Sequence, residues 1–198
     1  MKERPILFST PMVQAILDGR KTMTRRAVKN QSDCNVLIAG HDWEINELLA
    51  RCRYGQVGDI LWVRETWNYS FQNQTDYIIK GKYVYKADAD YVCDKWKPSI
   101  FMPREACRIM LEITKIRVER LQDISEEDAI NEGVEIAAYR PDIIYKQYTL
   151  DDNMRKIKLS GWETAYYSFK SLWQSINGPE SWTANPWVWV IEFKRIDR

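Results

Sequence analysis

One long alternating run limits the fold more than any other feature of the sequence. In residues 108–121 apolar and polar side chains alternate, as they do along a strand that buries one face. The apolar positions fall on two parities, first Ile109, Leu111 and Ile113, and then Ile116 and Val118. A change of parity needs one extra residue, so we predict a β-bulge near Thr114 and Lys115, as in a sheet that curls toward a barrel.

The remaining elements favour an antiparallel or mixed sheet. Apolar patterning predicts strands at residues 6–8, 60–67, 77–86 and 186–193, and helices at residues 10–18, 125–132 and 165–177. The strands of the middle region do not alternate regularly with helices, as they would in a doubly wound fold. We therefore predict an α+β fold in which a small, partly closed mixed or antiparallel β-barrel is flanked by helices.

The length of the chain predicts one domain. Its 198 residues lie near the usual size of a single domain. We expect residues 1–198 to form it, with inserted arms at about 30–56, 68–107 and 134–160. No apolar run approaches the roughly 20 residues that span a bilayer, and the first residues lack the apolar stretch of a secretory signal. We expect a cytoplasmic protein that does not bind membranes.

The cysteines do not form a metal-binding pattern. Cys34, Cys52, Cys93 and Cys107 are widely spaced, and His41 is the single histidine of the sequence. Zinc sites need closely spaced pairs of such ligands, so we expect no metal and no cofactor. Free, mostly buried thiols are the favoured interpretation. A nucleophilic pair of Cys34 and His41 is a weaker alternative, because no orienting partner follows a known pattern.

Positive charge is concentrated in one short segment. A net charge of +1 argues against a protein that binds polyanions over its whole surface. Ten residues without an acid nevertheless contain Arg20, Lys21, Arg25, Arg26 and Lys29. This segment is either a solvated basic turn or a local contact for a nucleic acid.

The same segment places an amine near a hydroxyl. Gly19 is expected to end the first helix, after which a tight path can bring Lys21 and Thr24 together. An amine beside a hydroxyl is a minimal base and nucleophile if the lysine is partly neutral. Lowering a lysine pKa from about 10.4 to about 7.5 requires about 4 kcal/mol of desolvation and repulsion by neighbouring cations. The alternative is a cation that stabilises a helix end and a threonine that stabilises a turn.

A carboxylate from another part of the chain would complete such a site. Glu132 lies in the last turn of a predicted helix, just before Gly133, where the helix dipole disfavours negative charge. If it faces Lys21, it can orient that amine or return a proton; the alternative is an exposed surface position. Glu65 is the second candidate, and a surface ion pair with Arg64 is its simpler explanation.

Two motifs form a pattern that is similar to a known family. Gly19-x-Lys21-x-x-Thr24-x-Arg26 is followed downstream by Ser-Glu-Glu-Asp-Ala-Ile-Asn-Glu-Gly133, and together they resemble the ASCH superfamily, which is related to PUA-like RNA-binding barrels. Residues 4–12, 62–67 and 185–193 resemble the longer ASCH proteins of phages and prophages. The resemblance covers both ends of the chain and none of the inserted arms.

The resemblance implies a function and a set of residues. Small bacterial members of the superfamily are amidohydrolases that release cytidine and acetate from N4-acetylcytidine with a lysine, a threonine and a glutamate. Lys21 and Thr24 match this set by spacing, and Glu132 matches it by its place in the helix. This chain is about twice as long as those members, which bears on the identity of its substrate.

Three functions follow from these observations. The first is an amidohydrolase with catalytic Lys21, Thr24 and Glu132. The second is a module without activity that binds a nucleoside or single-stranded RNA, in which Arg25 and Arg26 contact phosphates and an aromatic ring stacks on a base. The third is a phage accessory protein with a vestigial pocket and an unknown protein partner. For a substrate or ligand, the expected contacts are Gly19, Arg25, Arg26, Trp62, Arg64, Glu65 and Trp67.

Overall fold

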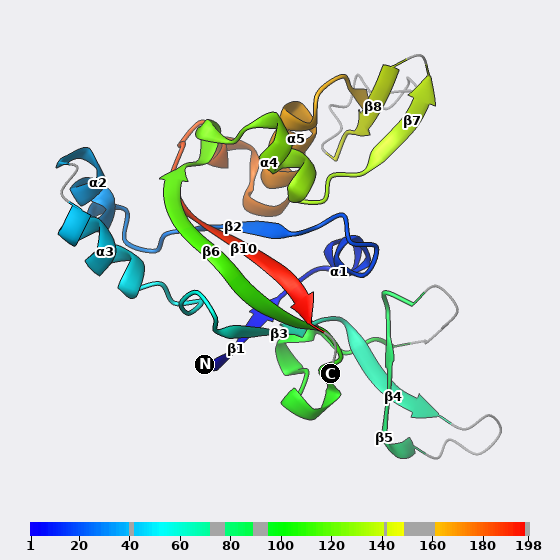
Figure 1. The fold of residues 1–198 in the computed structure, drawn as a ribbon. Helices are drawn as coiled ribbons and strands as arrows, with labels where there is room; N and C mark the ends of the chain where they lie inside the picture. The colour runs from blue at the N-terminus through cyan, green and yellow to red at the C-terminus, as the bar shows by residue number, and fades with distance from the viewer. Residues whose placement is uncertain (40–41, 72–77, 89–94, 141, 149–160, 197–198) are drawn as a thin grey trace.

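A five-stranded mixed sheet forms the centre of the molecule. The computed structural model describes residues 1–39, 42–71, 78–88, 95–140, 142–148 and 161–196. The strand order is β1-β3-β6-β10-β2 (Figure 1). The strands are β1 (Glu3–Leu7), β2 (Met23–Ala27), β3 (Ile60–Arg64), β6 (Met110–Arg120) and β10 (Trp187–Ile196). Only β1 and β3 pair in parallel among these neighbours. The predicted α+β class with a mixed sheet is confirmed.

The predicted bulge lies in the longest strand. In the ladder between β6 and β10, Lys115 pairs with Glu192 and Ile113 pairs with Phe193, so Thr114 has no partner residue. The extra residue moves the apolar side chains before and after it onto the same buried side of a bent strand. The change of parity seen in the sequence is thus a structural feature of the sheet.

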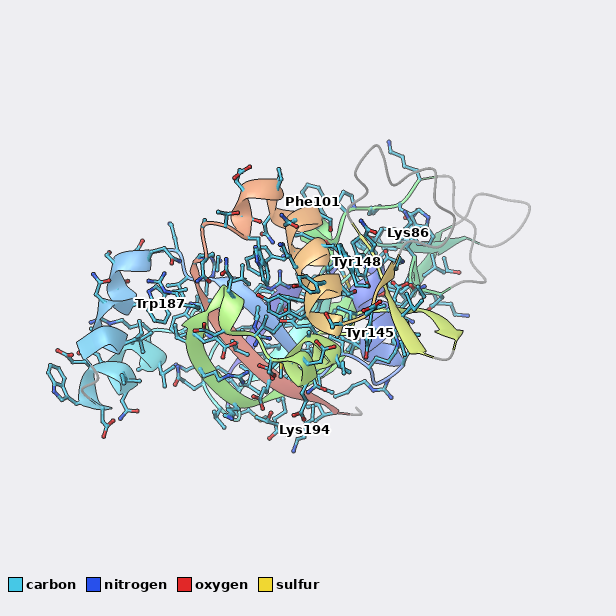
Figure 2. The ribbon with its side chains drawn as sticks, turned by 90° about the horizontal axis from the view of Figure 1, so that it is seen from above. Lys86, Phe101, Tyr145, Tyr148, Trp187 and Lys194 are labelled. Atoms are coloured by element: carbon cyan, nitrogen blue, oxygen red, sulfur yellow. The ribbon has the colours of Figure 1, made fainter. Side chains whose placement is uncertain are left out.

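Helices cover both faces of the sheet. On one face, α1 (Thr10–Leu17) packs against strand residues that include Leu111 and Ile191. On the other, α4 (Glu126–Asn131) and α5 (Ala165–Asn177) cover the alternate residues Val188 and Val190. Figure 2 shows α5 lying across the sheet with Tyr145 and Tyr148 beside it. All three helices were predicted, and the Oγ of Ser125 accepts the capping hydrogen bond at the start of α4 at 3.1 Å.

Three arms extend from the central sheet, as Figure 1 shows. The described elements of these arms lie mostly within residues 30–56, 68–107 and 134–160, and the second arm contains the predicted strand near residues 77–86. The first arm holds η1 (Gln31–Asn35), α2 (Val36–Ala39) and α3 (Asp42–Ala50). The second arm holds β4 (Trp67–Phe71), β5 (Ile78–Tyr85), η2 (Ser99–Phe101) and η3 (Arg104–Ala106). The third arm holds β7 (Ile136–Arg140) and β8 (Asp142–Lys146), and β9 (Gly161–Trp162) pairs with β8. Two short connections complete the described elements, η4 (Leu121–Asp123) and η6 (Pro179–Ser181).

The central sheet has two edges, β1 and β2, and no ladder joins them in the described part of the chain, so no closed barrel is present there and the partly closed barrel stays a prediction. One expectation about the strands differs from the structure. The strand predicted at residues 60–67 is interrupted, because β3 ends at Arg64 and β4 begins at Trp67 in a separate sheet. At the break, the buried carboxylate of Glu65 turns to the guanidinium of Arg108.

Within the described residues, no helix is long and apolar enough to cross a membrane. Cys34, Cys52 and Cys107 are buried, as predicted, and Cys34 and Cys52 are free thiols. Cys93 and His41 lie outside the described residues, so the alternative pair of Cys34 and His41 has no structural description.

Candidate active site

The turn after α1 carries Lys21 into the interior. Gly19 adopts a φ of +74°, a left-handed conformation that glycine tolerates without cost. The backbone N–H groups of Arg20 and Lys21 both donate to the carbonyl of Ala15, at 2.9 and 3.0 Å. The chain therefore folds back on the helix end, and Lys21 is 2% exposed just before β2 begins.

The end of α4 meets this turn. The N–H of Thr22 donates to the carbonyl of Asn131 at 2.9 Å, and Lys21 forms an isolated bridge with Glu132. The next residue, Gly133, has a φ of +84°, and a Cβ added to it would lie 2.8 Å from the Cβ of Lys21. The two segments can approach this closely because position 133 has no side chain.

A buried ion pair joins the two segments. The Nζ of Lys21 donates to the Oε2 of Glu132 at 2.7 Å and to its backbone carbonyl at 2.8 Å. The two side chains are 0% and 4% exposed. Burial lowers the pKa of the Lys21 amine below its ordinary value, while the carboxylate of Glu132 opposes that shift. The sequence hypothesis of a desolvated lysine next to Glu132 agrees with this geometry.

Arg25 is surrounded by carboxylates. Its Nη1 lies 3.5 Å from the Oε1 of Glu132, and its Nη2 donates to Asp128 at 2.6 Å and also to Glu119. Arg117 contacts the same Asp128 and Glu119. The Arg25 side chain is 0% exposed, so its positive charge is balanced by these carboxylates inside the protein. This geometry does not favour the expected contact of Arg25 with a phosphate.

Thr24 and Glu132 line one cavity. Thr24 is 2% exposed, and in the described parts of the chain its hydroxyl makes no hydrogen bond, including none to Lys21. The cavity has a volume of about 70 Å³ and lies at the open edge of β2. The residues that line it are Met12, Thr24, Arg25, Arg26, Ala27, Glu132, Phe169, Leu172, Trp173, Ile176 and Asn177. Lys21 is not among them, although its amine contacts the carboxylate of Glu132, which does line the cavity.

Arg26 is the other basic residue at the cavity. Its guanidinium donates to the carbonyl of Leu7 at 2.7 Å and lies 5.2 Å from the ring centre of Phe8. Arg26 therefore spans from β2 to the end of β1 while lining the cavity. Gly19 does not line the cavity; its part is to form the turn that positions Lys21.

The other expected contacts lie elsewhere. Trp67 is 2% exposed, and its ring packs against Tyr69 and Tyr83 in the second arm, so it is not available to stack on a base. The guanidinium groups of Arg64 and Arg104 lie 5.4 and 5.8 Å from the ring centre of Trp62. None of Trp62, Arg64, Glu65 and Trp67 lines the cavity at Thr24.

The surroundings of Glu65 differ from the surface ion pair that the sequence suggested. It is 1% exposed, and its carboxylate accepts two hydrogen bonds from Arg108, at 2.9 and 3.0 Å, instead of pairing with Arg64. Burial raises the pKa of Glu65, and Arg108 opposes the shift. Arg64 donates to the backbone carbonyls of Ile100 and Met102. The explanation by a surface ion pair is therefore wrong.

Sequence reasoning did not identify two parts of the site. The first is the pair of acids Glu119 and Asp128 that neutralise Arg25. The second is the apolar wall from α5, which includes Phe169 and Trp173. The apolar stripe of α5 was predicted as core, and a stripe of this kind carries no signal that distinguishes core from cavity wall.

Comparisons of the chain with protein-family models, with curated proteins and with solved structures give no match. In the residues that the structure describes, no cluster of His, Cys, Asp and Glu has the composition of a metal site. The geometry at Thr24 and the sequence resemblance are therefore the observations that bear on function.

Proposed function

We propose that this protein is an amidohydrolase of the ASCH type that cleaves N4-acylated cytidine, with N4-acetylcytidine as the first substrate to test. One observation carries the proposal, namely that Thr24 and Glu132 line the same cavity, that Glu132 pairs with the buried Lys21, and that the hydroxyl of Thr24 makes no hydrogen bond in the described parts of the chain. Each residue type is required by the chemistry, and the substrate class comes from the resemblance.

The reaction divides into acyl transfer and hydrolysis. The Oγ1 of Thr24 attacks the acyl carbon, and its proton passes to the amine of Lys21, which must first give a proton to Glu132. The C–N bond then breaks, N4 of cytidine takes the proton from Lys21, and the acyl group remains on Thr24 as an ester. Water attacks this ester with the same groups as base and acid, which releases acetate and restores the hydroxyl.

The free structure represents the resting arrangement of these groups. The amine of Lys21 donates to Glu132 and not to Thr24, so a substrate must draw the two side chains into contact. Hydrogen bonds of catalytic groups are often long in free enzymes and shorten in the complex. The lowered pKa of Lys21 supports its role as a base, because burial favours the neutral amine.

The size of the cavity limits which part of the substrate enters. A volume of about 70 Å³ is well below the 300–1,000 Å³ of pockets that enclose whole drug-sized ligands. We expect the acyl amide to enter while the ribose remains outside. Leu172 and Ile176 of α5 also line the cavity, so the acyl group has an apolar wall available to it.

The curl of the sheet supports the PUA-like relationship. Although no ladder closes the described sheet, the guanidinium of Arg26 on β2 reaches the carbonyl of Leu7 on β1. The rings of Phe8 and Phe193 also meet, with centres 6.2 Å apart. A side-chain bridge of this kind between the two edge strands fits a partly closed barrel.

We expect the purified protein to release cytidine from N4-acetylcytidine, as followed by chromatography of the two nucleosides. Thr24→Ala is expected to reduce the rate to the background without enzyme, because no other hydroxyl replaces the nucleophile. Thr22→Ala is the matched control, since Thr22 lies two residues away, is exposed and holds its contacts through the backbone. A wild-type protein without turnover, or a Thr24→Ala variant with full turnover, would contradict the proposal.

The absence of a hydrogen bond between Lys21 and Thr24 in the described structure favours a second function, in which the same cavity binds a modified base or an RNA end without cleaving it. Because Arg25 is neutralised internally, Arg26 is the cation left to contact the ligand. A binding module predicts RNA affinity that decreases with salt and decreases again in Arg26→Ala. Affinity that does not respond to either change would exclude this function.

A further inference from the structure

The open edge of β2 presents unused backbone groups next to Thr24. In the ladder with β10, the N–H of Val28 donates to Trp187 and the N–H of Phe193 donates to Thr22. Antiparallel strands alternate between hydrogen-bonded and non-hydrogen-bonded pairs. The register therefore directs the backbone groups of Thr24 and Arg26 to β10, and those of Met23, Arg25 and Ala27 away from it.

The N–H of Arg25 has no partner in the described parts of the chain. β2 is the last strand of the sheet, and its ladder is formed with β10 alone. Among the described residues, no other backbone or side-chain acceptor bonds this N–H. An unpaired N–H inside a protein is costly unless water or a ligand satisfies it. Residues 24–27 line the cavity, so the strand that carries this donor forms part of the cavity wall.

The carboxylates around Arg25 remove its guanidinium as a source of stabilisation for a developing anion. Its guanidinium contacts Glu119, Asp128 and Glu132, and three carboxylates leave it no free charge to offer. The amine of Lys21 is engaged in proton transfer. Arg26 also lines the cavity, but its guanidinium donates to the carbonyl of Leu7, whereas a backbone dipole of β2 is fixed in position and needs no reorganisation.

Building on the proposed function, we propose that the backbone N–H of Arg25 is the oxyanion donor of the reaction. Attack by the Oγ1 of Thr24 on the acyl carbon forms the C–O bond, and the π electron pair of the carbonyl moves onto the acyl oxygen. This N–H belongs to the peptide bond that follows Thr24, so it lies within reach of an oxygen on a carbon attached to Oγ1. When the bond to N4 breaks, the electron pair returns and the carbonyl forms again.

The donor is tested by replacing one amide with an ester. Cys34 allows a peptide of residues 1–33 to be joined by native chemical ligation to recombinant residues 34–198. An ester between Thr24 and Arg25 removes this N–H and keeps every side chain. We expect kcat for N4-acetylcytidine to fall by about 10²–10³-fold, the loss typical of one oxyanion donor. The KM and the unfolding temperature should change little.

An ester between Thr22 and Met23 is the matched control. The N–H of Met23 also points away from β10, but Met23 does not line the cavity, so full activity is expected. Three results would each overturn the assignment. The first is an Arg25 ester with unchanged kcat, and the second is a Met23 ester whose kcat falls by a similar factor. The third is a fall in kcat of the Arg25 ester that is accompanied by a fall in its unfolding temperature.

If the protein does not hydrolyse N4-acetylcytidine at all, the outcome differs from loss of the oxyanion donor alone. If the all-amide semisynthetic protein binds N4-acetylcytidine without cleaving it, hydrolysis is excluded and the N–H is tested by affinity. A Kd raised at least fivefold by the Arg25 ester and unchanged by the Met23 ester would support a donor to the acyl oxygen. An equal Kd in the three proteins, or no binding by any of them, would overturn it.

Discussion

Replacing Glu132 by glutamine is expected to destabilise the protein by about 3–5 kcal/mol, because removing one partner of a buried ion pair leaves the other charge uncompensated. The Nζ of Lys21 is fully buried, and Glu132 supplies both its carboxylate contact and a carbonyl contact. Glutamine keeps the size of the side chain and removes the charge. Urea unfolding at pH 7 measures the change as a shift of the midpoint at constant slope.

A double variant separates this effect from loss of packing. Lys21→Met combined with Glu132→Gln removes both charges and keeps two side chains of similar length. Most of the lost stability should return, since no unpaired ammonium remains. Equal destabilisation in the single and double variants would show that the charge of Lys21 is not the cause.

The pH dependence of the single variant follows from the direction of the pKa shift. In Glu132→Gln the pKa of Lys21 falls further, because the carboxylate of Glu132 is the main interaction that opposes the effect of burial. The unfolded chain keeps this proton up to about pH 10.4. Between the folded pKa and that value the unfolded state binds more protons, so stability should rise with pH by up to about 1.4 kcal/mol per unit. Below the folded pKa the full cost remains, and the double variant should lack this slope.

The parts of the site that were predictable depend on neighbours in the sequence. The bulge at Thr114 was visible because alternation is a local property of a strand. The ends of α1 and α4 followed from Gly19 and Gly133, which adopt positive φ. These ends place Lys21 and Glu132, so the central pair was predictable even though 111 residues separate its members.

The rest of the site depends on tertiary contacts that no local pattern encodes. Arg25 meets Glu119 and Asp128 across 94 and 103 residues, and nothing near it in the sequence distinguishes it from a free cation. Trp67 belongs to a strand-like segment, yet a break at residues 65–66 takes it into a separate sheet. The composition of β2 likewise does not show that it is an edge strand, which is the property that leaves the N–H of Arg25 open.

Gly133→Ala is expected to destabilise the protein by about 2–5 kcal/mol. A left-handed backbone costs a residue with a Cβ about 1–2 kcal/mol, and forcing atoms into a packed interior costs about 1–3 kcal/mol more. The new Cβ would lie 2.8 Å from the Cβ of Lys21 and 3.0 Å from the Cβ of Ala15, so one segment must move. The displacement acts on the turn that holds Lys21 against Glu132, and turnover should fall together with stability.

Gly19→Ala distinguishes crowding from backbone strain. Gly19 also has a positive φ, +74°, and lies in the same turn, but a Cβ added to it would meet no other atom within 4 Å. Its replacement should cost only the conformational part, about 1–2 kcal/mol. Urea unfolding of both variants gives the difference, which measures how closely the end of α4 is packed on Lys21. If the two variants lose the same stability, the contact between Gly133 and Lys21 is not tight, and the close approach of Glu132 to the amine must be held by the ion pair alone.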